Sequence, residues 1–262
     1  LFCDSDNNDY TLAENSTSIG MGALGVGCGP IDGGDIYTGP WYVSVDGSND
    51  GDGTIDNPFS TIQSGIDVAI GGDSVLVGPG TYNESISYNG KQIVIISTDG
   101  PQSTYIHSNN DNVRFENQEG SGAVLSGFTL SGNGSGYGVR TYMYSSPILD
   151  NLVIYGKNKA IFLYAYNDVS ISNTTLVNND YGIWGDSSDA DATLINSIIW
   201  FCSSTPIFLN NSGNDIDVSY SNIQGGEINI GGVGEVHWGE GNIDENPLFC
   251  DSDNNDYTLA EN

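Results

Sequence analysis

The sequence predicts an all-β fold, a single-stranded parallel β-helix (solenoid) in which coils of 22 to 24 residues stack on one another. Glycine accounts for 36 of the 262 residues and charged residues for only 15%, which suits many tight turns. Two independent columns of aliphatic residues repeat with the period of one coil. The first column is Val139, Ile161, Ile183 and Ile207, and the second is Leu125, Leu149, Ile171, Leu194 and Val218.

The same 15 residues, LFCDSDNNDYTLAEN, stand at Leu1–Asn15 and again at Leu248–Asn262. Chance does not produce an unchanged match of this length. The sequence therefore has a repeat period of 247 residues. It predicts one large β domain of a longer protein that repeats this unit end to end.

The first predicted elements are a strand, an acidic turn and one helix. Residues 41–45 alternate as a short strand, and the turn 46–53 follows. Ser60–Gln63 has the form of a helix capping box, and Gly71–Gly72 ends the helix. We expect this N-terminal capping helix to cover the open end of the solenoid. Its apolar stripe consists of Ile62, Ile66, Ala69 and Ile70.

From Ser74 onward the chain alternates between short strands and turns. The first strands are predicted at Ser74–Val77, Gln92–Ile96 and Asn112–Phe115. A leucine-rich repeat has a similar period, but its LxxLxL consensus is missing and the coils show no helical stripe. The β-branched residues of the coils favour the β-helix.

Three asparagines follow the second aliphatic column by two residues. In a stacked turn, one amide side chain can donate to the next, so they predict an asparagine ladder that stabilises the stack and has no catalytic role. The ladder residues are Asn151, Asn173 and Asn196.

The charge balance excludes two classes of partner. Five Lys and Arg residues face 34 acidic ones, and the net charge of -29 repels nucleic acid and anionic lipid surfaces. No apolar run is long enough for a membrane span, so we expect no membrane insertion. A divalent cation is the natural counter-ion, and the competing interpretation is that acidity only keeps a surface protein soluble.

Two segments resemble a known group of proteins. YVSVDGSNDGDGTIDNPFSTIQSGIDVAIGGDSVLVGPGTYNESI (Tyr42–Ile86) and GNIDENPLFCDSDNNDYTLAEN (Gly241–Asn262) resemble the first coil and the closing segment of pectate-lyase-like right-handed β-helix repeat proteins of bacterial surfaces and secretions. The resemblance implies a right-handed β-helix and an extracellular or cell-surface location. It says little about activity, because the fold carries lyases, hydrolases, epimerases and inert surface proteins.

The resemblance also implies unit boundaries. Residues 1–29 look like the tail of a preceding unit, 30–40 like a linker, and 41–262 like the β-helix domain with its closing tail. Whether residues 1–29 pack on their own domain or on a neighbour stays open.

The cysteines are interpreted within the same boundaries. The four residues lack metal-type CxxC spacing, so a disulfide fits better than a zinc site. The resemblance implies that Cys3 and Cys28 close one tail loop and that the partner of Cys250 lies in the next unit. Cys202 either bonds Cys250 or remains a buried thiol, and we favour the thiol.

Lyases of the group that the chain resembles use calcium together with a Lys or Arg base. Arg114 and Arg140 are the candidate bases, because each follows an inward-pointing valine and they are expected to stack about 5 Å apart on adjacent coils. The competing interpretation, which we favour, is two solvated arginines on an acidic protein. The other basic residues, Lys91, Lys157 and Lys159, fall in predicted turns.

Aromatic residues continue the arginine column and predict an outward-facing stripe. Such a stripe stacks on sugar rings, contacts another unit or is covered by the protein's own loops; contact with another unit is the functional interpretation we favour. The stripe consists of Tyr142, Tyr144, Phe162, Tyr164, Tyr166, Trp184 and Phe208.

Two oxygen-rich loops are candidate calcium sites, with turn formation by Asp and Asn as the alternative. Neither has the Gly and Glu positions of an EF-hand. The first comprises Asp46, Asn49, Asp50, Asp52 and Asp56, and the second includes Asp4 and Asp6.

The expected function is a structural or adhesive repeat unit of a long extracellular or cell-surface protein or filament, joined head to tail with copies of itself. The alternative is a calcium-dependent polysaccharide lyase or glycan-binding module. It would use the arginines and the aromatic stripe as its groove.

Overall fold

The computed structural model describes residues 2–4, 9–12 and 39–259. The chain divides into two compact units, residues 1–38 and 39–262. The first contributes the antiparallel pair β1 (Phe2–Asp4) and β2 (Asp9–Leu12). Most of the predicted tail and linker, including Cys28 and Asp6, lies outside the described residues.

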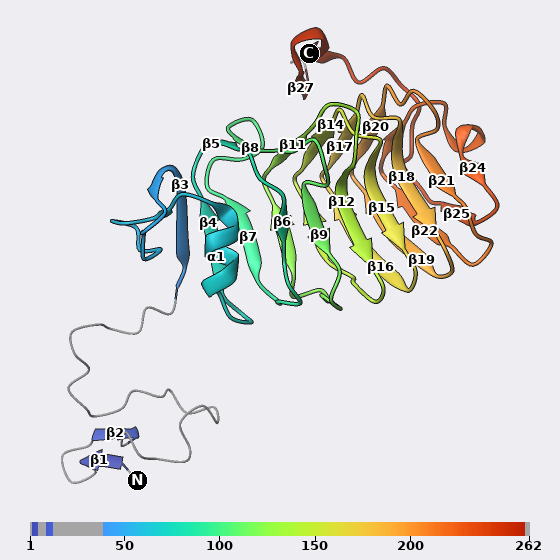
Figure 1. The fold of residues 1–262 in the computed structure, drawn as a ribbon. Helices are drawn as coiled ribbons and strands as arrows, with labels where there is room; N and C mark the ends of the chain where they lie inside the picture. Colours follow the sequence, from blue (N-terminus) through green and yellow to red (C-terminus); the bar gives the residue numbers. More distant parts are fainter. Residues whose placement is uncertain (1, 5–8, 13–38, 260–262) are drawn as a thin grey trace. The chain divides into compact units, whose positions relative to one another are not determined.

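The second unit is built from three parallel sheets, and each full coil contributes one strand to each of them (Figure 1). Sheet I contains β3 (Trp41–Ser48), β4 (Ser74–Val77), β7 (Val94–Ser97), β10 (Val124–Ser126), β13 (Ile148–Asp150), β16 (Asn167–Ser172), β19 (Ala190–Ile195), β22 (Asp215–Ser219) and β25 (Glu235–Trp238). Sheet II contains β5 (Gly80–Tyr82), β8 (Thr104–His107), β11 (Thr129–Ser131), β14 (Val153–Tyr155), β17 (Thr175–Val177), β20 (Ile198–Trp200) and β23 (Asn222–Ile223). Sheet III contains β6 (Ile86–Ser87), β9 (Val113–Phe115), β12 (Tyr137–Tyr142), β15 (Lys159–Tyr164), β18 (Tyr181–Asp186), β21 (Ile207–Leu209) and β24 (Gly231–Gly232).

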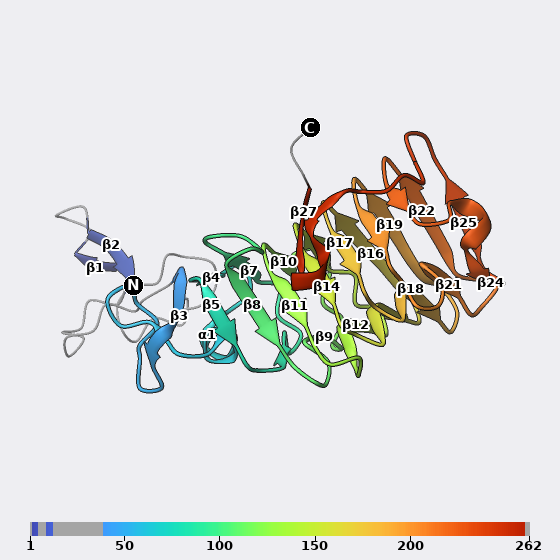
Figure 2. The ribbon, with the colours of Figure 1, turned by 90° about the horizontal axis from the view of Figure 1, so that it is seen from above.

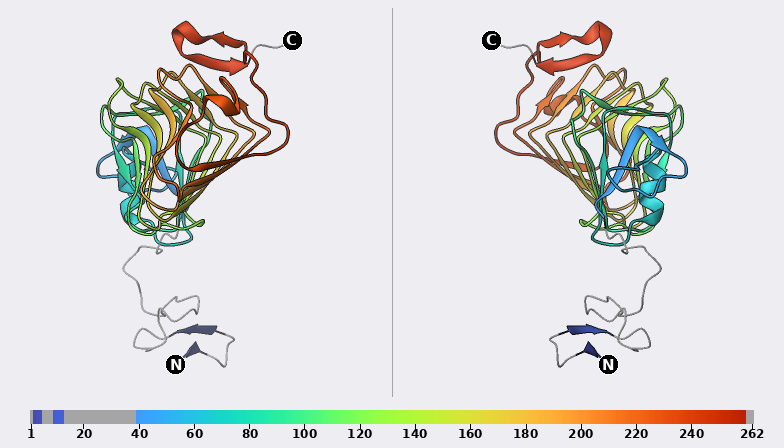
Figure 3. Two further views of the ribbon diagram at one scale, coloured as in Figure 1. Left: turned by 90° about the vertical axis from the view of Figure 1, so that its right-hand side faces the viewer. Right: turned by 90° about the vertical axis from the view of Figure 1, so that its left-hand side faces the viewer.

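This arrangement is a single-stranded parallel β-helix, as predicted. Neighbouring strands within a sheet lie one coil apart in the sequence, so every coil is hydrogen-bonded to the coil before and the coil after it. Figure 2 shows successive strands side by side along the axis, and the end-on views of Figure 3 show the coils superimposed.

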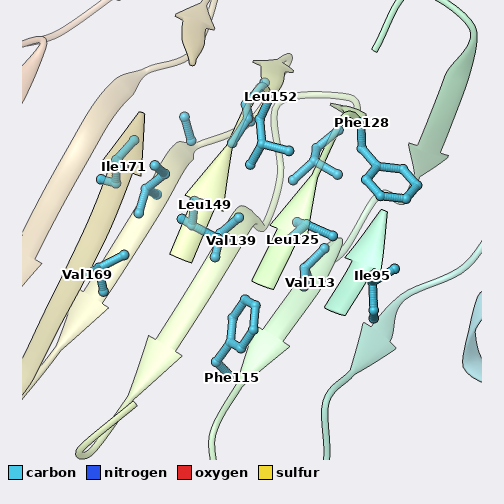
Figure 4. Packing of buried hydrophobic residues seen from close by; sticks show 14 of the residues in the cluster. Ile95, Val113, Phe115, Leu125, Phe128, Val139, Leu149, Leu152, Val169 and Ile171 are labelled. Carbon is cyan, nitrogen blue, oxygen red and sulfur yellow. The ribbon is translucent and has the colours of Figure 1, made fainter. Parts of the chain in front are cut away.

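Both predicted aliphatic columns are confirmed. Val139 is in register with Ile161, which is in register with Ile183, and the column ends on Ile207. Every member of this column is fully buried, and no member of the second column is more than 1% exposed. In Figure 4, Val113 lies beside Val139 and Leu125 beside Leu149, so equivalent residues of successive coils fill the axis of the solenoid.

The helix α1 (Ile62–Val68) packs on β3, β4 and β6 at the N-terminal end, as the capping-helix prediction requires. Two details of that prediction are wrong. The N-cap is Thr61, and the next two helical amides donate to the Glu84 carboxylate, not to a local capping box. Ile70 lies beyond the C-cap Ala69 and is 70% exposed, because the helix ends before the stripe does.

The asparagine ladder is shorter than predicted. Asn196 Nδ2 donates to Asn173 Oδ1 at 2.6 Å, but Asn173 then donates to Asp150 Oδ1 at 2.7 Å and not to Asn151. All three asparagines have φ near +50°, a conformation that asparagine tolerates better than most residues. Their shared position is therefore the left-handed corner between sheets I and II.

The chain ends in a second antiparallel hairpin. After the short 3-10 helix η2 (Glu227–Asn229) and strand β25, the chain forms β26 (Phe249–Asp251) and β27 (Asp256–Leu259), joined by the 3-10 turn η3 (Ser252–Asn254). None of the helices among the described residues is long and apolar enough to cross a membrane.

We expect Ile183→Ala to lower the free energy of unfolding by about 2–5 kcal/mol, because it leaves a cavity between Ile161 and Ile207. The matched control is Ile228→Ala, since Ile228 is 97% exposed and its truncation is expected to change stability by less than about 0.5 kcal/mol. Urea titrations followed by circular dichroism measure both. Equal effects of the two changes would contradict the predicted core.

Candidate functional site

The candidate surface is the outer face of sheet III, where side chains alternate with the buried column. Arg114 pairs with Arg140, and Arg140 pairs with Phe162 in the next coil. The same column continues through Trp184 to Phe208. The two arginines therefore form one line across successive coils with Phe162, Trp184 and Phe208, and Tyr142 pairs with Tyr164 in a separate column.

Arg140 lies among acidic and aromatic partners. Its Nη1 is 3.5 Å from Asp111 Oδ2 and 3.4 Å from Glu116 Oε1, and its Cζ lies 5.6 Å from the centre of the Tyr142 ring. The guanidinium group of arginine is a permanent cation, and here it forms ion pairs with these two carboxylates. The geometry suits a structural cation better than a base directed at a substrate. Arg114 pairs with Arg140 on the adjacent strand, and its side chain is partly exposed.

The aromatic rings of the stripe stack on each other across coils. The centres of Tyr142 and Tyr164 are 4.5 Å apart with ring planes at 3°, and those of Tyr144 and Tyr166 are 5.0 Å apart at 9°. Trp184 and Phe208 are 4.4 Å apart at 22°. One face of each ring is thus covered by its partner, so the stripe is not an open platform for sugar rings.

Phe162 corrects the prediction that the whole stripe faces solvent. It is only 8% exposed, because Tyr137 from the preceding coil stacks on it with 4.5 Å between ring centres. Tyr137 was not among the predicted stripe residues. Its spacing of 22 residues from Lys159, and of Lys159 from Tyr181, is the sequence signal for this additional column.

Lys159 is the central cation of this surface. It lies in β15 and not in a turn, and its Nζ is 4.5 Å from the centre of the Trp184 ring and 5.3 Å from that of Tyr137. Nζ also donates to Asn158 Oδ1 at 2.8 Å. Burial lowers the pKa of Lys159, against the opposing charges of Asp186 and Asp180. The rings therefore enclose a cation that the chain itself supplies.

The two remaining lysines bind backbone carbonyls. Lys91 Nζ donates to the carbonyls of Ile66 and Asp67 at the end of α1, at 2.7 and 2.8 Å. Lys157 is 1% exposed and donates to the carbonyls of Ser108 and Asn110, two coils earlier, and burial lowers its pKa to about 8. Each described lysine therefore supports the fold directly.

The half-exposed ends of the stripe are Tyr144 and Tyr166, which are 55% and 45% exposed. Both have positive φ, as do the residues Met143 and Ala165 that precede them. Bulky residues rarely adopt this conformation, and strain of this kind concentrates at functional sites. This tyrosine pair is the part of the stripe that is accessible to a partner.

On the outer face of sheet I, acidic residues stack from coil to coil, whereas those that stack on sheet III are aromatic and basic. Asp168 pairs with Asp191, the Asp215 amide donates to Asp191 Oδ1 at 2.8 Å, and Asp215 pairs with Glu235. We call these four residues the acidic ladder. Burial, together with Asp215, Asp189 and Asp168, raises the pKa of Asp191. Like charges on adjacent strands are destabilising.

Among the described residues, one group of three side chains has metal-type ligands close together. Asp215, Glu235 and His237 bring one ligand atom each within 4.8 Å of the others, and all three are exposed. The imidazole does not fit calcium, which takes oxygen ligands. This group was not predicted, because Asp215 lies one coil before Glu235 and His237.

The first predicted calcium loop uses its oxygens within its own turns. Asp52 Oδ1 accepts from the amide and the hydroxyl of Thr54, at 3.0 and 2.7 Å, and these bonds lower the pKa of Asp52. Asn49 Oδ1 accepts from the Ser60 hydroxyl. Asp46, Asp50 and Asp56 are exposed and form no group of ligands with these residues. The donor set therefore does not fit the calcium site that the sequence suggested.

The second predicted calcium loop shows the same use of oxygens in its C-terminal copy. The side chains of Asp4 and Asp6 lie outside the described residues. In the copy, Asp251 Oδ2 accepts from Asn254 Nδ2 at 2.8 Å, and Asp256 Oδ1 accepts from the amide and hydroxyl of Thr258. Turn formation accounts for these acids.

Cys202 and Cys250 are free thiols. The partly buried Cys202 packs against the core, and burial raises the pKa of its thiol to about 12. Cys250 is exposed. The predicted disulfide between Cys3 and Cys28 lies outside the described residues.

Comparison with known proteins adds one structural likeness. The chain is similar to the crystal structure of pectate lyase Pel9A, with 14% sequence identity and a TM-score of 0.38 over 85% of this chain and 87% of that one. The chain is a parallel β-helix. A likeness of this degree carries no argument about activity. No family model matches the sequence, and no curated protein matches it.

We expect Asp191→Asn to raise the melting temperature at pH 7 by roughly 1–3 °C. The amide keeps an oxygen for the Asp215 amide and removes one charge from the ladder. The pKa of Asp191 in the folded state is raised above its ordinary value of 3.8. Ionisation of this carboxyl therefore destabilises the fold, and the effect grows as pH rises from 3.8 and is complete above the folded-state pKa. The difference between variant and wild type is therefore expected to shrink as pH falls toward 3.8.

Asp217→Asn is the matched control for this measurement. Asp217 lies on the adjacent strand β22 but pairs with Thr193 and His237, so no acid stands opposite it. Calorimetry of both variants between pH 4 and 8 measures the effect. An equal gain from the control would show that net charge, and not the ladder, is responsible.

Proposed function

We propose that the chain is a structural or adhesive repeat unit of a long extracellular or cell-surface protein or filament, joined head to tail with further copies of itself. The parallel β-helix suits this role, because its length grows with the number of coils and each coil needs only its neighbours. With strands about 4.8 Å apart, the nine strands of sheet I form a rod about 40 Å long.

The observation that carries the proposal is a hairpin that occurs twice. In β1–β2, Phe2 pairs with Leu12 and Asp4 with Asp9. In β26–β27, Phe249 pairs with Leu259 and Asp251 with Asp256, the same positions one period later. One sequence therefore forms one hairpin in one register at two places, as expected where one unit ends and the next begins.

The arrangement of charges speaks against the lyase alternative. Arg140, the candidate base, is held between Asp111 and Glu116 on the face of sheet III. The acidic ladder lies on sheet I instead, and the predicted calcium loop uses its oxygens in turns. A lyase needs the cation and the base at one sugar residue. In this proposal calcium enters only as a counter-ion for the acidic ladder.

The adhesive part of the proposal rests on Tyr144 and Tyr166. These stacked rings are half-exposed and carry hydroxyl groups, so they offer both apolar area and hydrogen bonds. Tyrosine is common in protein interfaces for this reason. Our preferred partner is another copy of the unit, and a polysaccharide is the alternative.

Electron microscopy of the native multi-unit protein tests the structural role. We expect a row of rods, each about 40 Å long, that are separated by short connections. The number of rods is expected to rise with the number of 247-residue periods in the chain. A single globular particle that contains one rod would contradict the proposal.

An enzyme assay tests the alternative. We expect no calcium-dependent release of unsaturated uronate from pectin or polygalacturonate at alkaline pH, because no base stands free beside a cation site. The matched variant is Arg140→Ala. Uronate release by the wild type that disappears in Arg140→Ala would overturn the structural role in favour of the lyase.

A further inference from the structure

The C-terminal hairpin β26–β27, which we call the tail hairpin, packs on the outer face of sheet II (Figure 1). The buried residues of this contact are Val177 and Trp200 from the sheet and Tyr257 from the hairpin. They form a cluster that is separate from the core of the solenoid. We call the sheet residues of this cluster the docking face, and they are Val153, Tyr155, Val177, Ile198 and Trp200.

Tyr257 is the main anchor of the tail hairpin. It is 6% exposed, and its ring centre lies 5.6 Å from that of Tyr155 and 5.5 Å from that of Phe249. Asn178 Nδ2 donates to its hydroxyl at 2.7 Å. Burial raises the pKa of Tyr257. A buried aromatic ring with a satisfied hydroxyl is typical of an interface anchor.

The N-terminal hairpin β1–β2 has the same sequence and the same strand register as the tail hairpin. Phe2 and Tyr10 stand one period before Phe249 and Tyr257. A two-stranded hairpin is marginally stable on its own and needs a surface to pack on. The docking face is a surface that this sequence is seen to fit.

We propose that the docking face binds the N-terminal hairpin of a second copy of the chain in the way it binds its own tail hairpin. The inference rests on the proposed function, because it names the contact through which copies join. The described residues contain both hairpins and this docking face. The tail hairpin occupies the docking face because it is covalently attached to the solenoid, and this attachment gives the hairpin a high effective concentration at the face. Release of the tail hairpin therefore opens the face to a neighbour, as in domain swapping.

The test expels the tail hairpin from the full chain by placing charges at its two apolar anchors. In Phe249→Asp/Tyr257→Asp, two carboxylates would be buried without partners, so the hairpin leaves the docking face. We expect the wild type to sediment as a monomer at 100 μM and this variant to form dimers and larger species whose fraction grows with concentration. The solenoid stays folded, since its core does not include these residues.

Two matched variants identify the contact. Adding Phe2→Asp/Tyr10→Asp to the released chain removes the second hairpin, and adding Trp200→Asp removes the docking face; each is expected to restore the monomer. Circular dichroism checks that all variants keep the β-helix. A released chain that stays monomeric, or that associates equally without Tyr10 or Trp200, would overturn the inference.

This outcome is distinguishable from failure of the proposed function. Native multi-unit rods in electron micrographs together with a monomeric released chain would leave the structural role standing and overturn the docking between copies. If hairpins are exchanged between copies of a protein that shows no rods, the docking between copies stands and the structural role is overturned.

Discussion

In-register hydrogen bonding between successive coils is the constraint on which the rest of the structure depends. Because each strand pairs with the equivalent strand one coil later, each side chain lies on the side chain at the same position of the next coil. Val139, Ile161 and Ile183 thus fill the axis, and asparagines share a left-handed corner. The same in-register pairing that produces the aliphatic columns also stacks aromatic rings. It places acidic side chains beside one another as well, and their repulsion destabilises the fold.

The outer faces show how the chain manages that rule. On sheet III, aromatic residues in register cover one another's faces, and Lys159 supplies the cation that their electron-rich rings attract. On sheet I, Asp168, Asp191 and Asp215 stand on successive strands, and burial together with the charges of the neighbouring acids raises the pKa of Asp191. The solenoid thus combines a stabilising column with a destabilising one, and the well-filled core must outweigh the second.

The sequence predicted the columns in which one kind of residue repeats at the coil period, and it missed the mixed columns and the contacts made outside the coils. Both aliphatic columns were found because one residue type repeats at one spacing. The Lys159 cluster was missed because its column mixes Tyr137, Lys159 and Tyr181, so no single residue type repeats. In the first predicted calcium loop, Asp52 accepts from Thr54 two residues on, a local contact that composition does not reveal. The docking face was missed because it joins Trp200 to a segment outside the coil pattern.

The end of the solenoid limits how units can join. If coils of one unit stacked directly on the next, sheets would run from unit to unit, but α1 covers the N-terminal end and packs on β3, β4 and β6. A helix at this position protects strand edges that otherwise pair with other chains. Under the proposed function, the connection must therefore use segments that do not obey the coil register. The tail hairpin is such a segment, since its contacts with Val177 and Trp200 form a cluster apart from the core. It can move between copies without unstacking a single coil, which no strand of the solenoid can do.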